Sequence, residues 1–157
     1  MRRMKITAVT MMIACAIGSI LVAPASAAES SRVADATAEM KPVKVYTGDD
    51  GIRVEVARIA KSDPPRALVR VTGLENDRDG KVLLHVIKDR GRGRESLETQ
   101  IAGSTSRTIS TEVHRWGRQK YRILHTGKGR TVVRLAYDKD ASEKQSSAEL
   151  LADHRKQ

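Results

Sequence analysis

The side chains best suited to binding chemistry in this sequence are cations, and they are concentrated in one central stretch. Residues 81–134 hold 13 Lys and Arg against 4 Asp and Glu, a net charge of +9. Residues 28–80 and 135–157 each carry a net charge of −1. A block of one sign indicates association with anions and carries no information about the fold.

Three segments carry most of this surplus: KDRGRGR at 88–94, HRWGRQKYR at 114–122 and GKGR at 127–130. In the first, arginines alternate with flexible glycines, which suits an adaptable loop against an anionic surface. In the second, the only tryptophan lies beside a turn, where it can stack on a sugar or a base. We expect the three segments to form one cationic surface. The candidate binding residues are Lys88, Arg90, Arg92, Arg94, Arg115, Trp116, Arg118, Lys120, Arg122, Lys128 and Arg130.

Each basic segment also has an ordinary structural interpretation. Lys and Arg protect edge strands against aggregation, and hairpin loops need solvated residues. Trp116 would then cap one end of a core that is poor in aromatic residues. We expect the neighbouring cations to be exposed under both interpretations. The binding hypothesis depends on the three segments together, because scattered charge would not leave both flanks slightly acidic.

The motifs that would indicate catalysis, metal binding or a cofactor are weak. His114 and His125 fall near Glu112 across an expected hairpin, as an acid–base pair for phosphodiester cleavage would require. Strand alternation, however, places the two histidines on opposite faces. The segment at 75–80 lacks the spacing of a calcium loop, and TGKGRT lacks that of a phosphate loop. We therefore predict no enzyme, no metal and no cofactor, with a small hydrolase using His114 and His125 as the third possibility.

The first 27 residues have the layout of a secretory signal peptide. Basic residues at positions 2, 3 and 5 precede an apolar run over 6–22, and small residues follow at 25–27. We expect cleavage after Ala27 and a secreted or periplasmic location. If uncut, the run is long enough to span a bilayer. Cys15 offers a lipidation site as a further alternative, but the apolar run continues past it, which favours a plain small hydrophobe.

The rest of the sequence predicts a single β domain of small aliphatic residues. Residues 28–40 indicate a flexible linker, and residues 41–138 show a period of two with turn signals such as Asp50-Gly51. About eight short strands favour an all-β fold, an antiparallel β-sandwich of the immunoglobulin-like type. Because the chain has no Phe, we expect Val, Ile and Leu to fill the core. Residues 139–157 predict a short C-terminal helix or tail.

These observations favour an exported small binding domain that docks an anionic partner through a basic face. The partner would be an acidic polysaccharide, a lipid headgroup, nucleic acid or an acidic protein surface. Binding of this kind weakens steeply with salt, because it releases counterions. The alternative is a secreted protein–protein interaction module, such as an inhibitor, immunity or assembly accessory protein. Such a module would bind through an exposed sheet edge or an apolar patch.

Overall fold

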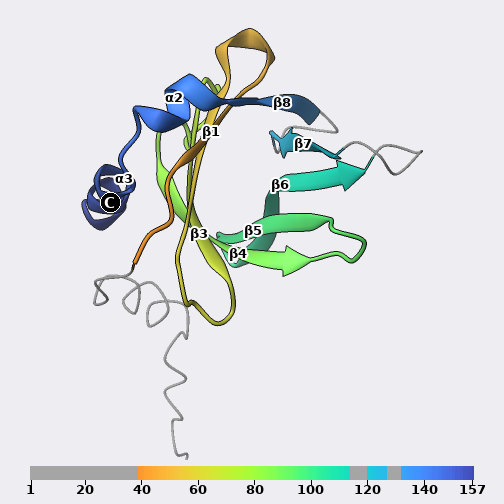
Figure 1. The fold of residues 1–157 in the computed structure, drawn as a ribbon, viewed down its shortest axis with the longest axis horizontal. Helices are drawn as coiled ribbons and strands as arrows, with labels where there is room; N and C mark the ends of the chain where they lie inside the picture. Colours follow the sequence, from red (N-terminus) through yellow and green to blue (C-terminus); the bar gives the residue numbers. More distant parts are fainter. Residues whose placement is uncertain (1–38, 114–119, 127–131) are drawn as a thin grey trace, which may run out of the picture.

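The computed structural model of the chain describes residues 39–113, 120–126 and 132–157, which form an antiparallel β-barrel followed by two short helices (Figure 1). Each strand pairs with the next strand in the sequence. The elements are β1 (Lys44–Thr47), a 3-10 turn η1 (Asp49–Gly51), β2 (Arg53–Arg58), β3 (Arg66–Thr72), β4 (Val82–Asp89), β5 (Glu95–Ile101), β6 (Ser104–Val113), β7 (Lys120–His125), β8 (Val132–Asp138), α2 (Lys139–Glu143) and α3 (Ser147–Arg155).

The eight strands close into a barrel, so the prediction of an immunoglobulin-like β-sandwich is wrong. Residues 45–47 of β1 pair with residues 136–138 of β8, and this joins the last strand to the first. A strand with one buried face shows the same alternation of apolar and polar residues in a sandwich and in a barrel. The sequence pattern therefore predicts the strands and their buried faces, but it does not distinguish two sheets from one closed sheet.

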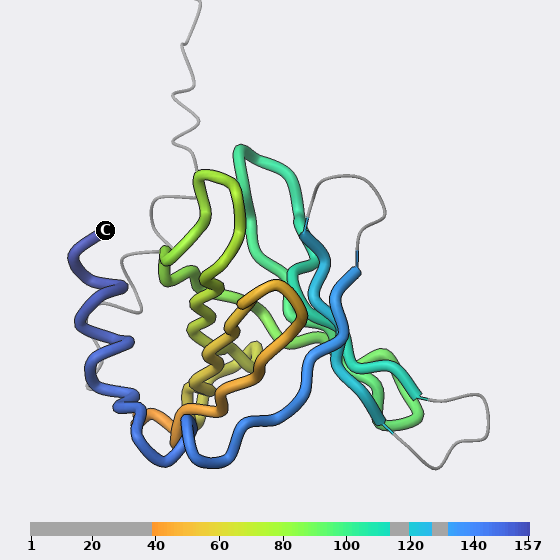
Figure 2. The backbone as a smooth tube through the Cα atoms, turned by 90° about the horizontal axis from the view of Figure 1, so that it is seen from above, coloured from red at the N-terminus to blue at the C-terminus, as the bar shows by residue number. Residues whose placement is uncertain are grey.

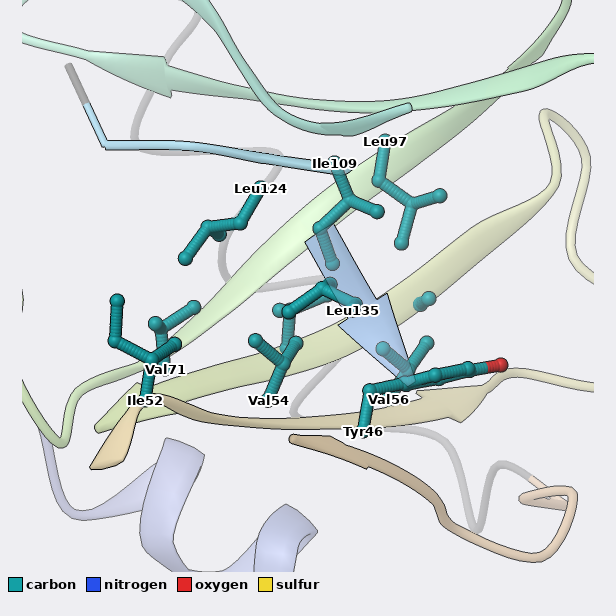
Figure 3. Close-up of a cluster of buried hydrophobic side chains, with 11 residues drawn as sticks. Tyr46, Ile52, Val54, Val56, Val71, Leu97, Ile109, Leu124 and Leu135 are labelled. Atoms are coloured by element: carbon teal, nitrogen blue, oxygen red, sulfur yellow. The ribbon is translucent and has the colours of Figure 1, made fainter. Parts of the chain in front are cut away.

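The barrel interior is filled by aliphatic side chains, as the composition predicts. Val54 and Val56 of β2, with Ile52 just before the strand, point inward and meet Leu97 and Ile109 from the other side of the barrel (Figure 3). The interior of an eight-stranded barrel is just wide enough for side chains to fill it. Small branched residues therefore complete this core without Phe. The buried set consists of Tyr46, Ile52, Val54, Val56, Ala67, Val69, Val71, Leu97, Ile109, Leu124 and Leu135.

A second apolar layer lies outside the barrel, beneath the C-terminal helices. Val45, Leu68 and Val82 face outward from β1, β3 and β4, and Leu150 of α3 packs on this layer. The predicted C-terminal helix is thus present as two helices. Strand β4 is covered by the core on one side and by α3 on the other, which explains why its sequence has apolar residues on both faces.

Polar contacts join the helices to the barrel wall. The Ser142 hydroxyl accepts a hydrogen bond from the Val45 N–H at 2.8 Å and donates one to the Asp138 carbonyl at 2.5 Å. Glu55 is buried on the outer face of β2, where its carboxylate binds Arg70 and accepts a hydrogen bond from Gln145 at 2.7 Å. Because α2 and α3 satisfy buried groups of the barrel, they are part of its folded unit.

The two ends of the barrel differ in charge. One end carries the β4–β5 connection and the start of β7, which lie on the same side of the molecule in both views (Figures 1 and 2). We call it the basic end. The other end carries residues 48–51 and 73–81, where Gly73 lies directly against Gly51. We call these two segments the acidic segments, because together they contain five carboxylates and only two cations.

Candidate functional site

The β4–β5 hairpin at the basic end holds its arginines on a well-ordered turn. The Arg90 N–H donates to the Arg94 carbonyl at 2.9 Å, and the Arg94 N–H donates to the Gly91 carbonyl at 3.0 Å. The Asp89 carboxylate accepts from the Gly91 N–H at 2.7 Å. Gly91, Arg92 and Gly93 all have positive φ, with Arg92 at 55°. The glycines predicted to make this loop adaptable instead allow a tight left-handed turn.

Lys120 joins this hairpin from the next one. A Cβ atom placed on Gly93 would lie 2.5 Å from the Lys120 ammonium nitrogen, so the ammonium rests directly on the glycine. Lys120, Arg92 and Arg94 are exposed. Within the described part of the chain, none of these three cations forms an ion pair with a carboxylate. Their three positive charges at the basic end are therefore not balanced by a paired carboxylate of the described residues.

Glu98 anchors the outer side of the hairpin and gathers several cations around one carboxylate. Its side chain is 7% exposed and lies 3.5 Å from the Lys88 ammonium and 3.7 Å from Nε of Arg107, and it also binds an Arg90 guanidinium nitrogen. Burial alone would raise the pKa of Glu98, but hydrogen bonds from Ser96 and Arg90, with the charges of Arg90 and Lys88, hold its pKa below the usual value. Three cations against one carboxylate leave a positive balance here.

Arg122 does not belong to the exposed surface, so the expectation that it is exposed is wrong. Its side chain is 18% exposed and donates to the Glu95 carboxylate at 2.8 Å. Its guanidinium carbon lies 4.9 Å from the ring centroid of Tyr46, which belongs to the interior core. Arg58 binds the same carboxylate. Arg122 therefore closes the barrel interior at the basic end and is not available to a partner.

The structure brings together some of the predicted binding residues and separates others. Lys88, Arg90, Arg92, Arg94 and Lys120 lie at the basic end, and we call these five residues the basic cluster. The boundaries of the third segment, His125 at the end of β7 and Val132 at the start of β8, lie toward the opposite end of the barrel. The predicted residues outside the described ranges are Arg115, Trp116, Arg118, Lys128 and Arg130.

Two features of this site were missed by sequence reasoning. Arg107 reaches Glu98 because the pairing of β5 with β6 shifts register between Leu97 and Glu98. This bulge has no evident turn signal in the sequence. The neutralisation of Arg122 depends on Glu95, which is 27 positions away. Local alternation cannot reveal such a contact.

The expectation that alternation turns His125 away from the face of Glu112 is wrong, because the strand register puts His125 on the same face as Ser110 and Glu112. The hydrogen bonds there nevertheless differ from those that a hydrolase needs. His125 Nε2 lies 3.0 Å from the Ser110 oxygen, and that hydroxyl also donates to Glu112 at 3.2 Å. A serine hydroxyl has one proton, so a bond donated to Glu112 makes Nε2–H of His125 the donor to Ser110. In that state the imidazole does not act as the base that would take a proton from the serine hydroxyl. The proposed partner, His114, is outside the described residues.

Other features of the described ranges add little direct evidence of function. Within residues 39–113, 120–126 and 132–157, no three His, Cys, Asp or Glu side chains gather as metal ligands would. Among the helices described, none is long and apolar enough to cross a bilayer. No family model, curated protein or solved structure shows detectable similarity to this chain.

Proposed function

We propose that this chain is an exported binding domain that docks a polyanion through the basic cluster at the end of its barrel. The observation that carries the proposal is the exposed trio of Arg92, Arg94 and Lys120, which comes from two adjacent hairpins and has no carboxylate partner in the described ranges. Guanidinium groups suit phosphate, sulfate and carboxylate groups, because their planar donors make two-point contacts.

The remainder of the barrel supports docking at this end. The acidic segments at 48–51 and 73–81 lie toward the opposite end of the barrel, so their carboxylates do not compensate the basic cluster. The Glu98 carboxylate holds Lys88 and Arg90 beside the trio, so the cations need little reordering on binding. Less ordering cost leaves more of the electrostatic attraction as affinity.

A heparin matrix tests the proposal with a matched pair of variants. The hairpin variant replaces the three exposed cations of the basic cluster with Gln (Arg92→Gln, Arg94→Gln, Lys120→Gln). The helix variant makes the same change in net charge on the C-terminal segment (Lys139→Gln, Lys144→Gln, Lys156→Gln). We expect the wild type and the helix variant to elute at similar, elevated salt, and the hairpin variant to elute much earlier.

The class of anion follows from parallel measurements with the same proteins. Sulfated polysaccharide, polyphosphate and vesicles containing anionic lipid present different anionic groups, and the tightest binder identifies the preferred class. Equal loss of retention in both variants would refute docking at the basic cluster, because net charge alone would then explain the binding. Absence of retention at low salt would also refute it.

A further inference from the structure

A groove on the outer face of the barrel has the features of a second binding site. β4 and β5 pair only through residues 86–89 and 95–98, and they diverge before Val86. Near this divergence a cavity of about 320 Å³ opens beside α3, within the lower range of small-molecule sites. Its lining includes Leu84 and Val86, the charged side chains of Arg66, Lys88 and Glu98, and His154 of α3.

The main chain beside this groove is held in place by side chains where strand pairing ends. The Thr99 hydroxyl donates to the Leu84 carbonyl at 2.7 Å. His154 Nδ1 lies 2.9 Å from the Val82 carbonyl, and the Gln157 side-chain oxygen accepts from the Val82 N–H at 3.2 Å. These contacts bridge the diverging strand to β5 and to the C-terminal segment. The groove is therefore a built feature of the fold.

The floor of the groove is apolar, whereas cations lie at the end where β4 and β5 meet. Leu84 and Val86 are only partly buried there, although they project from the same outer face that α3 covers further along. Lys88 lies two residues beyond Val86, and Arg66 pairs with Val86 from β3. Glu98 also lines the groove, but its carboxylate is compensated by Lys88, Arg90 and Arg107.

We propose that this groove binds an amphipathic anion, a linear acyl chain of moderate length that ends in a carboxylate. The chain would cover Leu84 and Val86, and the carboxylate would meet Lys88 at the end of the groove where β4 and β5 pair. Lys88 shares the Glu98 carboxylate with Arg90 and Arg107, so three cations face one carboxylate and Lys88 can accept a second anion. An uncharged chain would lack this contact, and a cationic chain would be repelled. The site is separate from the trio of Arg92, Arg94 and Lys120, which does not line the groove.

Calorimetric titration with octanoate and decanoate below their micelle concentrations tests this proposal. Affinity should rise about fourfold per added CH₂ group, or roughly fifteenfold from octanoate to decanoate. Decanol and decylammonium should each bind at least about tenfold more weakly than decanoate, because neither offers an anion to Lys88. Equal binding of decanoate and decylammonium would overturn the proposal, as would no binding of either acid.

Matched substitutions locate the site. Val86→Glu places a negative charge on the floor of the groove, and Val132→Glu makes the same change at an exposed position of β8. We expect the first to weaken decanoate binding about tenfold or more and the second to change it by less than about twofold. Lys88→Gln, at a side chain that is 54% exposed, avoids the risk of misfolding and should weaken binding about fivefold.

The hairpin variant separates this site from polyanion docking. It should lose retention on heparin and keep its affinity for decanoate, because its substitutions lie outside the groove. If Val86→Glu with a native far-UV spectrum, or Lys88→Gln, binds decanoate like the wild type, the assignment of the groove is wrong. That result would leave the docking of polyanions at the basic cluster untouched.

Discussion

Lowering the pH should destabilise this protein through one histidine in the barrel interior. His85 is 1% exposed, and its Nδ1 lies 3.0 Å from the Leu83 carbonyl, so Nδ1 carries the proton. Nε2, 2.8 Å from the Thr108 hydroxyl, then accepts a hydrogen bond in the neutral ring. Burial is the main reason that the pKa of His85 falls from 6.5 to about 4, and the charge of Arg78 lowers it further.

The direction and size of the effect follow from this pKa. The unfolded chain takes up the proton as the pH falls through 6.5, whereas the folded chain resists it until about pH 4. Stability is therefore fully present above pH 6.5 and is lost as the pH falls toward 4. Between about pH 7.5 and 5.5 the free energy of unfolding should fall by roughly 1.3 kcal/mol on account of this group.

Urea denaturation followed by far-UV circular dichroism measures this loss. His85→Gln is the matched variant, because Gln retains polar atoms for the interior contacts but has no proton to gain in this range. Between pH 7.5 and 5.5 its free energy of unfolding should fall by roughly 1.3 kcal/mol less than that of the wild type, which is the share assigned to His85. His125, whose pKa is also lowered by burial, titrates in both proteins. An equal loss of stability in the two proteins would refute the assignment to His85.

Three substitutions test other parts of the fold by the same denaturation assay. Glu55→Ala removes a buried carboxylate that accepts from Arg70 and Gln145, while Arg70 keeps Asp153, and should cost about 1–3 kcal/mol. Glu143→Ala, at an exposed helix pair, should cost less than about 0.5 kcal/mol, and similar costs would contradict the role of the buried network. Ser142→Ala removes the acceptor of the Val45 N–H and should cost about 1–3 kcal/mol, and a neutral result would show that this group finds another partner. Gly48→Ala places a methyl 2.6 Å from Cγ1 of Val133 and should cost about 1–3 kcal/mol through overpacking, unless β8 shifts to absorb it.

The strands and their buried faces could be predicted from the sequence, because burial on one face imposes a period of two. Val54 and Val56 of β2, with Val69 and Val71 of β3, all lie in the core as expected. Closure could not be predicted, since it depends on pairing between residues 45–47 and 136–138, far apart in the sequence. No local pattern reports whether the eighth strand reaches the first.

Only those features of the candidate site that depend on residues close together in the sequence could be predicted. The turn at 88–94 and its cations follow from the sequence, and five of the predicted residues gather at one end of the barrel. Alternation within β7 puts Arg122 on the same face as the buried Leu124, but it could not show that Arg122 meets Glu95 there. The groove beside α3 depends on how far β4 and β5 stay paired, which composition and period do not encode.

The most direct test of docking at the basic cluster is the salt dependence of binding to a short duplex DNA, a polyanion of known charge spacing. Each cation that neutralises a phosphate contributes roughly 0.9 to the slope of log K against log salt concentration. The slope for the hairpin variant should be shallower than that of the wild type by about 2 to 3, while the helix variant keeps the wild-type slope. Identical slopes for all three proteins would contradict the account.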